Sequence, residues 1–323
     1  MKSILVYVGL DLVGDGVMKL PFLSALRRLY PEARVTWLAG QGKTVYAGVL
    51  APLLTGLVDE VIQDAGIGLS AWELIAHPLN GRRFDLVIDT QRRFVTSLIL
   101  KRVRHGKFVS AAAGWTLSDA VPAGGKAKRP SMISQMFALL EAASGQSVPA
   151  PPPLSLSSGL LAEAARRLPE GPRYVGLAPG AGGKHKCWPL GHYLDIGARL
   201  AAEGLTPVFL VGPAERDWET GIRAALPQSL LPLTDRDAPP VTMALGTRLS
   251  AALANDSGTG HMLAAAGVPL VSLFGPTAPE KFAPAASVLT VIRAQEYGAE
   301  EMAAIRVEPV MTALERLLTS PRS

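Results

Sequence analysis

Short apolar runs alternate with helix-like segments along the first half of this 323-residue chain, and that alternation constrains the fold more than any single motif does. The segment at 17–30 carries apolar residues at helical spacing, with Pro21 near its start. Runs such as ILVYVG and LVID are apolar throughout, which is typical of strands buried on both faces. The pattern predicts a parallel sheet covered by helices on both faces. The strands predicted in this half are residues 3–9, 33–40, 58–64 and 84–90.

A segment rich in Pro and Ser, residues 144–159, follows and is typical of a linker. The alternation then restarts, so we expect two α/β domains, at 1–150 and 171–323, joined by a linker at 151–170. Two such domains imply a cleft, and ligands of such sheets bind at the carboxyl ends of the strands. The second half is predicted to contain strands at 173–180, 206–213, 269–276 and within 248–258, with helices at 190–204, 261–268 and 307–318.

The composition is that of a folded protein without a membrane-spanning helix. Hydrophobic residues make up 48% of the chain and charged residues 18%, which excludes disorder for most of it. No uncharged apolar run reaches about 18 residues, and the apolar run near the N-terminus is too short for the core of a signal peptide. Cys187 is the only cysteine, which excludes an internal disulfide and a cysteine-based zinc site and fits a reducing cytoplasm.

The positive charge of the chain is concentrated in its first half. Residues 1–150 contain 17 Lys or Arg and 11 Asp or Glu, a net charge of +6, whereas residues 151–323 have a net charge of −1. An anionic partner, such as a phosphorylated lipid, a membrane surface or a nucleic acid, is one interpretation, and an ordinary soluble basic surface is the other. The residues that either meet phosphates or form a solvated helix face are Arg92, Arg93, Lys101, Arg102, Arg104 and Lys107.

Motifs for several other chemistries are incomplete. GKT at 42–44 follows a predicted strand, but the first glycine of a nucleotide-binding P-loop would fall at Trp37. No GxGxxG motif opens either half, and no two histidines have the spacing of a catalytic zinc site. Asp235 and Asp237 have the spacing of a metal-binding pair, but no His or Glu supports them, which favours a solvated turn.

In the first half, Gly14-Asp15-Gly16 is expected to form a loop between the first strand and the next helix. Glycines let the backbone approach a ligand closely, and the N-terminus of a helix favours anions. Asp15 would then lie at the mouth of the cleft. The alternative is that Asp15 only caps its helix.

Three segments of the second half contain candidate ligand-binding residues. In the loop at 180–189, Lys184 and Lys186 either attract a phosphate or are solvated. Glu215 follows the next strand, where a carboxylate binds the sugar hydroxyls of a nucleotide or simply begins a helix. The segment 256–261 places small residues and backbone N–H groups directly before a helix, an arrangement that suits a diphosphate.

Taken together, these motifs resemble glycosyltransferase family 9, the bacterial lipopolysaccharide heptosyltransferases and their relatives. No single motif is specific to this family, but their combination is. The motifs are GD…LP at 14–21, K.WP at 186–189, DSG..H at 256–261 and FGPT at 274–277. The resemblance implies the GT-B architecture, an α/β fold of two Rossmann-like domains whose parallel sheets face each other across a cleft. It places the acceptor site mostly in the first domain and the nucleotide sugar mostly in the second, and it allows the last helix to pack back on the first domain. The matching blocks are residues 14–38, 179–189, 212–219, 255–284 and 302–318.

The resemblance also implies an inverting glycosyltransferase that needs neither a metal nor another cofactor, with ADP-heptose as the usual donor. Asp15 would be the general base and Lys186 would stabilise the departing diphosphate, together with backbone amides around 257–261. The expected donor-binding residues are Glu215, Asp256, Ser257, Gly258, Thr259, Gly260 and His261. The expected acceptor-binding residues are Arg92, Arg93, Lys101 and Arg104.

The partners implied are a nucleotide-sugar donor and an anionic, lipid-linked glycan acceptor, and not a nucleic acid. The expected location is the cytoplasm, with peripheral contact at the inner face of the inner membrane. The chain departs from the family pattern at Cys187, at Ala181-Gly182-Gly183 and at Thr259-Gly260, which bears on the identity of the donor sugar. An enzyme of this architecture that epimerises a nucleotide sugar, and a non-catalytic member that keeps the fold, are the alternatives.

Overall fold

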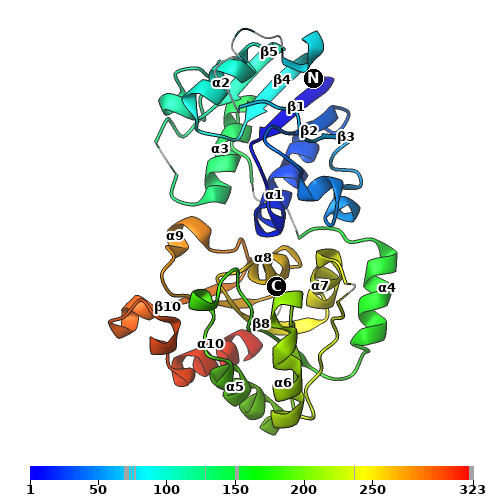
Figure 1. Cartoon of the computed structure of the whole chain (residues 1–323), viewed down its shortest axis with the longest axis vertical. Helices are drawn as coiled ribbons and strands as arrows, with labels where there is room; N and C mark the ends of the chain where they lie inside the picture. Colours follow the sequence, from blue (N-terminus) through cyan, green and yellow to red (C-terminus); the bar gives the residue numbers. More distant parts are fainter. Residues whose placement is uncertain are drawn as a thin grey trace. The chain divides into compact units, whose positions relative to one another are not determined.

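The chain divides into two units, residues 1–152 and 153–323, which are described separately (Figure 1). The computed structural model describes residues 1–68, 73, 75, 78–127, 129–149, 153–235 and 237–319. Within these ranges no helix is both long and apolar enough to cross a membrane.

The first unit is built on a parallel sheet of five strands in the order β3-β2-β1-β4-β5. The central strand, β1, is apolar and fully buried from Ile4 to Val8, as expected for a sheet covered on both faces. Leu5 and Tyr7 of β1 pack with Ile99 and Leu100 of α2, while α1 and α3 pack against each other. The elements are β1 (Ser3–Val8), α1 (Val13–Leu29), β2 (Arg34–Ala39), β3 (Glu60–Ile62), β4 (Arg83–Asp89), α2 (Phe94–Lys101), β5 (Arg104–Ser110) and α3 (Met132–Ser144).

Helix α1 begins earlier than the sequence predicts, so Gly14-Asp15-Gly16 forms its first turn and not a loop. The backbone N–H of Gly16 donates to the carbonyl oxygen of Leu12 at 2.8 Å, which closes that turn. A Cβ at Gly16 would lie 2.7 Å from side-chain atoms of both Leu50 and Val45. Glycine is therefore needed here for close packing against the segment after β2, and not for loop flexibility.

The second unit contains another parallel sheet of five strands, in the order β10-β9-β8-β6-β7. Its strands are β6 (Tyr174–Ala178), β7 (Thr206–Phe209), β8 (Leu249–Asn255), β9 (Leu270–Phe274) and β10 (Leu289–Arg293). Its helices are α4 (Ser158–Arg167), α5 (Leu190–Ala202), α6 (Glu219–Ala225), α7 (Pro239–Gly246), α8 (Gly258–Ala265), α9 (Pro279–Phe282) and α10 (Val307–Thr319).

Three elements, α4, β5 and β10, differ from the sequence predictions. Helix α4 forms inside the segment expected to be a linker, 151–170, and packs on α7. Residues 150–152, at the expected boundary, lie outside the described residues. Helix α10, which the sequence predicts at 307–318, packs on β8, β9 and α5 of its own unit through an apolar face that includes Val310 and Leu314. Two sheet-edge strands, β5 and β10, were not predicted.

Asp89, the last residue of β4, is a completely buried carboxylate in the first unit. It accepts hydrogen bonds from the hydroxyl of Ser97 in α2, from Ser110 Oγ at the end of β5 (2.8 Å) and from the backbone N–H of Gln91 (2.8 Å). Burial raises the pKa of Asp89 to about 6, although the three hydrogen bonds oppose that rise. One side chain thus joins the carboxyl ends of two strands to the helix between them.

We expect the stability of the protein to depend on the protonation of Asp89. Its pKa is raised from 3.8 to about 6 in the folded state, so protonation favours folding. This contribution is fully present below about pH 4 and is lost as the pH rises through about 6, at a cost of about 3 kcal/mol. Chemical denaturation of the wild type and of Asp89→Asn across this range measures it, because the variant lacks only this titration. A stability difference between the two proteins that does not change with pH would contradict the prediction.

Candidate functional site

Each parallel sheet has one topological switch point, where the chain continues from two neighbouring strands in opposite directions across the sheet. Ligands of such sheets bind at this point, outside the carboxyl ends of the strands. In the first unit the point lies between β1 and β4, and in the second unit it lies between β6 and β8. Asp15 follows β1, and Arg92 and Arg93 follow β4. Lys186 follows β6, and the segment 256–261 follows β8. These predicted residues therefore come after the strands that flank the two points.

Asp15 is half-buried in the first turn of α1. The residue that caps this helix is Leu12, which offers no side-chain hydrogen bond, so Asp15 is not the N-cap that the alternative interpretation requires. Among the residues that the structure describes, none donates a hydrogen bond to the Asp15 carboxylate. The positive end of the helix dipole favours a negative charge at this position. Asp15 is therefore an ionisable group that is left available at the end of β1.

Asn255, which sequence analysis did not single out, organises the corresponding edge of the second sheet. It is completely buried at the end of β8. Its Oδ1 accepts hydrogen bonds from the backbone N–H of Trp188 (3.2 Å) and the hydroxyl of Tyr193 (3.1 Å), and its Nδ2 donates to the carbonyl oxygen of Pro179 (2.7 Å). One amide therefore holds both ends of the loop after β6 against the end of β8. Its only sequence signal is a polar residue that ends an apolar strand.

Two of the predicted site residues, Lys186 and Asp256, lie together at this edge. The Lys186 ammonium lies 3.0 Å from Oδ2 of Asp256, and the same oxygen accepts a hydrogen bond from Thr277 Oγ1 at 2.7 Å. The Asp256 side chain is 10% exposed and that of Lys186 is 27% exposed. Thr277 belongs to the turn after β9, so this cluster draws on loops that follow three strands of the sheet.

The segment after Asp256 forms the N-terminus of α8. Ser257 is the N-cap residue, and its side chain accepts a hydrogen bond from the backbone N–H of Gly260 at 3.3 Å. The N–H of His261 donates to the carbonyl oxygen of Ser257 at 3.3 Å. The N–H groups of Gly258 and Thr259 precede the first intrahelical bond and have no acceptor within the helix. They are available to an anion at this end, as the sequence predicts, whereas the side chain of His261 is buried.

Glu215 lies on the loop after β7, within a short helical turn at Pro213–Trp218. A Cβ at Gly180 would lie 2.6 Å from the carboxyl carbon of Glu215, and one at Gly212 would lie 2.9 Å from its Oε2. Both glycines thus leave room for this carboxylate in its observed position. Burial raises the pKa of Glu215 above its usual value. The structure places Glu215 beside the loop that carries Lys186, because β6 and β7 are neighbours.

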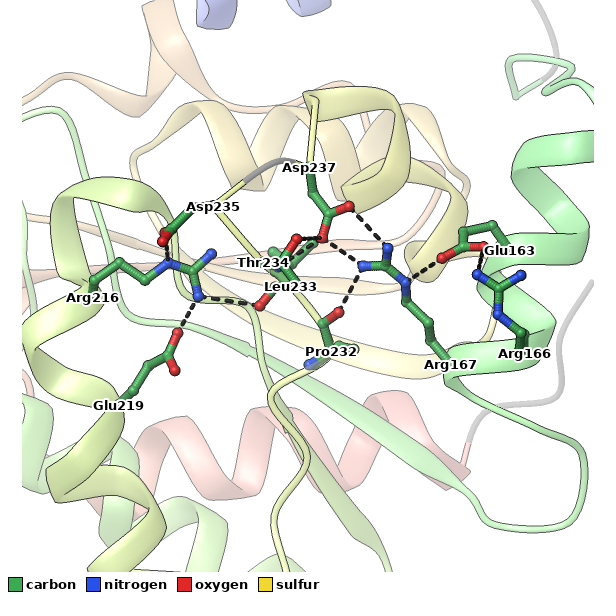
Figure 2. Close-up of polar contacts among 10 residues, drawn as sticks. All are labelled: Glu163, Arg166, Arg167, Arg216, Glu219, Pro232, Leu233, Thr234, Asp235 and Asp237. Atoms are coloured by element: carbon green, nitrogen blue, oxygen red, sulfur yellow. Dashed lines mark hydrogen bonds and ion pairs between the residues drawn. The ribbon is translucent and has the colours of Figure 1, made fainter.

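The residue after Glu215 anchors this loop (Figure 2). Arg216 forms ion pairs with Glu219 and Asp235, and it donates a hydrogen bond to the carbonyl oxygen of Leu233 at 3.1 Å. These contacts fix Leu233 and Asp235 against the base of the Glu215 loop.

The carboxylates of Asp235 and Asp237 are each bound by a different arginine. Asp237 accepts two hydrogen bonds from Arg167 of α4, at 2.5 and 2.9 Å, whereas Asp235 pairs with Arg216 (Figure 2). The turn is therefore held by ion pairs and is not simply solvated. Arg236 lies outside the described residues. Elsewhere in the described part of the chain, no three His, Cys, Asp or Glu side chains gather in a way that could hold a metal ion.

The predicted acceptor residues separate into two groups. Arg92 and Arg93 are exposed between β4 and α2, and neither guanidinium forms an ion pair or hydrogen bond with a described residue. Lys101 lies in the last turn of α2, where its ammonium binds the carbonyl oxygen of Leu117 (2.6 Å) and Asp119 (3.3 Å). Arg104 is the first residue of β5. Helix α2 starts near the carboxyl end of β4 and leads to the amino end of β5, which is parallel to β4. Lys101 and Arg104 therefore lie at the opposite end of the strands from Arg92 and Arg93.

Known proteins resemble the chain along most of its length. The lipopolysaccharide heptosyltransferase 2 of Escherichia coli K12 is 28% identical over 314 residues, covering 88% of this chain and 86% of that protein. The lipooligosaccharide heptosyltransferase 2 of Haemophilus influenzae is 36% identical over 126 residues, which is 37% of this chain and 36% of that protein. The solved structure of E. coli ADP-heptose LPS heptosyltransferase II has a TM-score of 0.70 at 24% identity and covers 98% of both chains, which shows the GT-B fold.

The family model for glycosyltransferase family 9 (heptosyltransferase) matches residues 72–309, well over half of the chain. The chain therefore belongs to glycosyltransferase family 9, a family of sugar-transferring enzymes.

Proposed function

We propose that the protein transfers a heptose from ADP-heptose, with inversion at the anomeric carbon, to a lipopolysaccharide core or a related surface glycan. The observation that carries the proposal is the cluster of Lys186, Asp256 and Thr277 beside the N-terminus of α8. It combines a cation, a carboxylate, a hydroxyl and free backbone N–H groups at the point of the sheet where nucleotides bind. The name of the E. coli relative, an ADP-heptose heptosyltransferase, supports the choice of donor.

The donor would be held mainly by these groups. The Lys186 ammonium and the N–H groups of Gly258 and Thr259 would bind the diphosphate, and Glu215 would bind the ribose hydroxyls. Ala181-Gly182-Gly183 supply no side-chain donors in the loop before Lys186, so the backbone of that loop would contribute in their place. Asp256 and His261 would contact the sugar-diphosphate. No metal is needed in this scheme, because the protein's own donors neutralise the leaving group.

The reaction would be a single displacement at the anomeric carbon. The Asp15 carboxylate accepts the proton of an acceptor hydroxyl as that oxygen forms its bond to the anomeric carbon. The bond from this carbon to the phosphate oxygen breaks on the opposite side, and its electron pair leaves with ADP. Stabilising the charge that develops on the diphosphate is the main requirement of such a transition state.

The acceptor would be anionic and linked to a lipid. The guanidinium groups of Arg92 and Arg93 have no ion-pair partner in the part of the chain that the structure describes. The next two residues, Phe94 and Val95, are about half exposed, at 50% and 46%. Arginines beside exposed apolar side chains suit a surface that meets phosphates and lipid together. We therefore propose peripheral contact with the inner face of the inner membrane, in the cytoplasm.

Replacing Asp15 with asparagine tests the general base. Asparagine keeps the shape of the side chain but does not accept the proton. We expect normal folding, near-normal binding of ADP, and turnover lower by about 10²-fold or more. Glu32→Gln, an exposed carboxylate of the same unit, is the matched control and should retain wild-type turnover. Near wild-type turnover by Asp15→Asn would assign the base to another residue, and an unfolded variant would give Asp15 a structural role.

Replacing Lys186 with alanine tests the diphosphate site. We expect ADP binding, measured by calorimetry, to weaken by about 1–3 kcal/mol, the range for a hydrogen bond that involves a charged group. Lys184→Ala is the control, because Lys184 is an exposed lysine of the same loop. If Lys186→Ala binds ADP as tightly as the wild type does, Lys186 is not part of the site.

Release of nucleotide from a panel of nucleotide sugars, measured with and without acceptor, separates the three functions. A transferase needs the acceptor for rapid release, an epimerase changes the sugar without one, and a non-catalytic member does neither.

A further inference from the structure

Lys19, in the first unit, is a buried cation that has no hydrogen bond or ion pair to a described residue. It lies one helical turn after Asp15 in α1, and only 8% of its surface is exposed. Within the described ranges, no residue accepts a hydrogen bond from its ammonium or forms an ion pair with it. Lysine is almost never buried to this extent without a partner.

The ammonium of Lys19 lies toward the N-terminal end of α1. Side chains on a helix lean toward its N-terminus, so Lys19 extends back over the turn that holds Asp15. Asp11 and Asp15 are the two carboxylates whose charges act on Lys19. Asp11 is already engaged, because its oxygens accept hydrogen bonds from Trp37 Nε1 (3.1 Å), Thr44 Oγ1 (2.7 Å) and the backbone N–H of Val45 (3.1 Å). Lys19 therefore lies beside Asp15 with hydrogen-bonding capacity to spare.

The folded chain compensates only in part for a lysine at this position, because the charges of Asp11 and Asp15 favour its charged form but do not offset its burial. Burial lowers the pKa of Lys19, which shows that the charged form is disfavoured there. The positive end of the α1 dipole adds to that cost, because cations are unfavourable at a helix N-terminus. A methionine would fill a similar volume without either penalty. An ammonium that is costly to bury and is left unpaired is expected where an anion from outside the chain completes the site.

We infer that Lys19 is a further residue of the acceptor site, where its ammonium binds an anionic group of the acceptor, a carboxylate or a phosphate, next to the hydroxyl that Asp15 deprotonates. The inference rests on the proposed function. The acceptor is the substrate to expect here because Lys19 and the proposed base lie on the same helix. Arg92 and Arg93 follow the neighbouring strand and are also unpaired among the described residues, so this edge of the sheet attracts anions.

The test uses the full chain, ADP-heptose and a heptose-deficient lipooligosaccharide in three forms: intact, dephosphorylated and carboxyl-reduced. In Lys19→Met we expect the KM for the intact acceptor to rise by about 10- to 100-fold, the size expected for one charge-assisted hydrogen bond, with the KM for ADP-heptose unchanged. The melting temperature of Lys19→Met should rise by a few degrees, because a buried charge is removed. Lys2→Met, an exposed lysine before β1, should change none of these values.

The modified acceptors identify the anionic group. The wild type should show a raised KM for one of the two modified acceptors. For that acceptor, the KM of Lys19→Met should be no higher than the KM of the wild type. An unchanged acceptor KM in Lys19→Met, or equal use of all three acceptors by the wild type, overturns the inference. So does a fall in the melting temperature, because it would make Lys19 a structural residue.

A second measurement does not depend on sugar transfer. Inorganic phosphate and acetate are titrated against the wild type and Lys19→Met, and binding is followed by calorimetry. Binding of either anion that is lost in Lys19→Met supports the site, even if the wild type transfers no sugar and the proposed function fails. The absence of a Lys19-dependent response to both anions overturns the site, even if the wild type is an active transferase.

Discussion

Both sheets of this protein are parallel and covered on both faces, and this constraint decides where polar side chains are found. Along β1 every residue from Ile4 to Val8 is fully buried and apolar or aromatic. A buried polar group that lacks a hydrogen bond destabilises the fold, so polar side chains are favoured at strand ends, where neighbouring elements supply partners, over strand interiors. Asp89 and Asn255 are completely buried polar residues at strand ends, and each makes three hydrogen bonds to neighbouring elements.

Sequence patterns predict the central strands of both sheets and the edge strands β3 and β7, but they miss the edge strands β5 and β10. A central strand is buried on both sides and shows as a continuous apolar run, as in 84–90, where β4 is observed at Arg83–Asp89. The sheet-edge strand β5, RHGKFVS, is exposed along its first half and reads as a cluster of basic residues. β10 lies at the other sheet's edge and is only partly buried. Edge strands carry polar residues because one of their sides is free of a neighbour.

The position of a residue after a strand can be predicted from sequence, but its partner cannot. Lys186 and Asp256 are 70 residues apart, and only the adjacency of β6 and β8 brings them into contact. The sequence does not distinguish Asn255 from any other polar residue at the end of a strand. It does not distinguish Lys19 either, because Lys19 falls within an amphipathic helical pattern. In both cases the informative property is burial of a polar group, which depends on how elements far apart in the sequence pack.

The ion pair between Lys186 and Asp256 also bears on how a donor would bind. The ammonium is already held in place, so binding a diphosphate costs less side-chain entropy than it would for a free lysine. The same pair opposes binding, because the Asp256 carboxylate competes for the ammonium and repels phosphate. If Lys186 turned to phosphate, Asp256 would keep its hydrogen bond from Thr277. The remaining acceptor capacity of the Asp256 carboxylate then suits a sugar hydroxyl. A single pair of opposite charges would therefore orient a nucleotide sugar, with its phosphates toward Lys186 and its sugar toward Asp256.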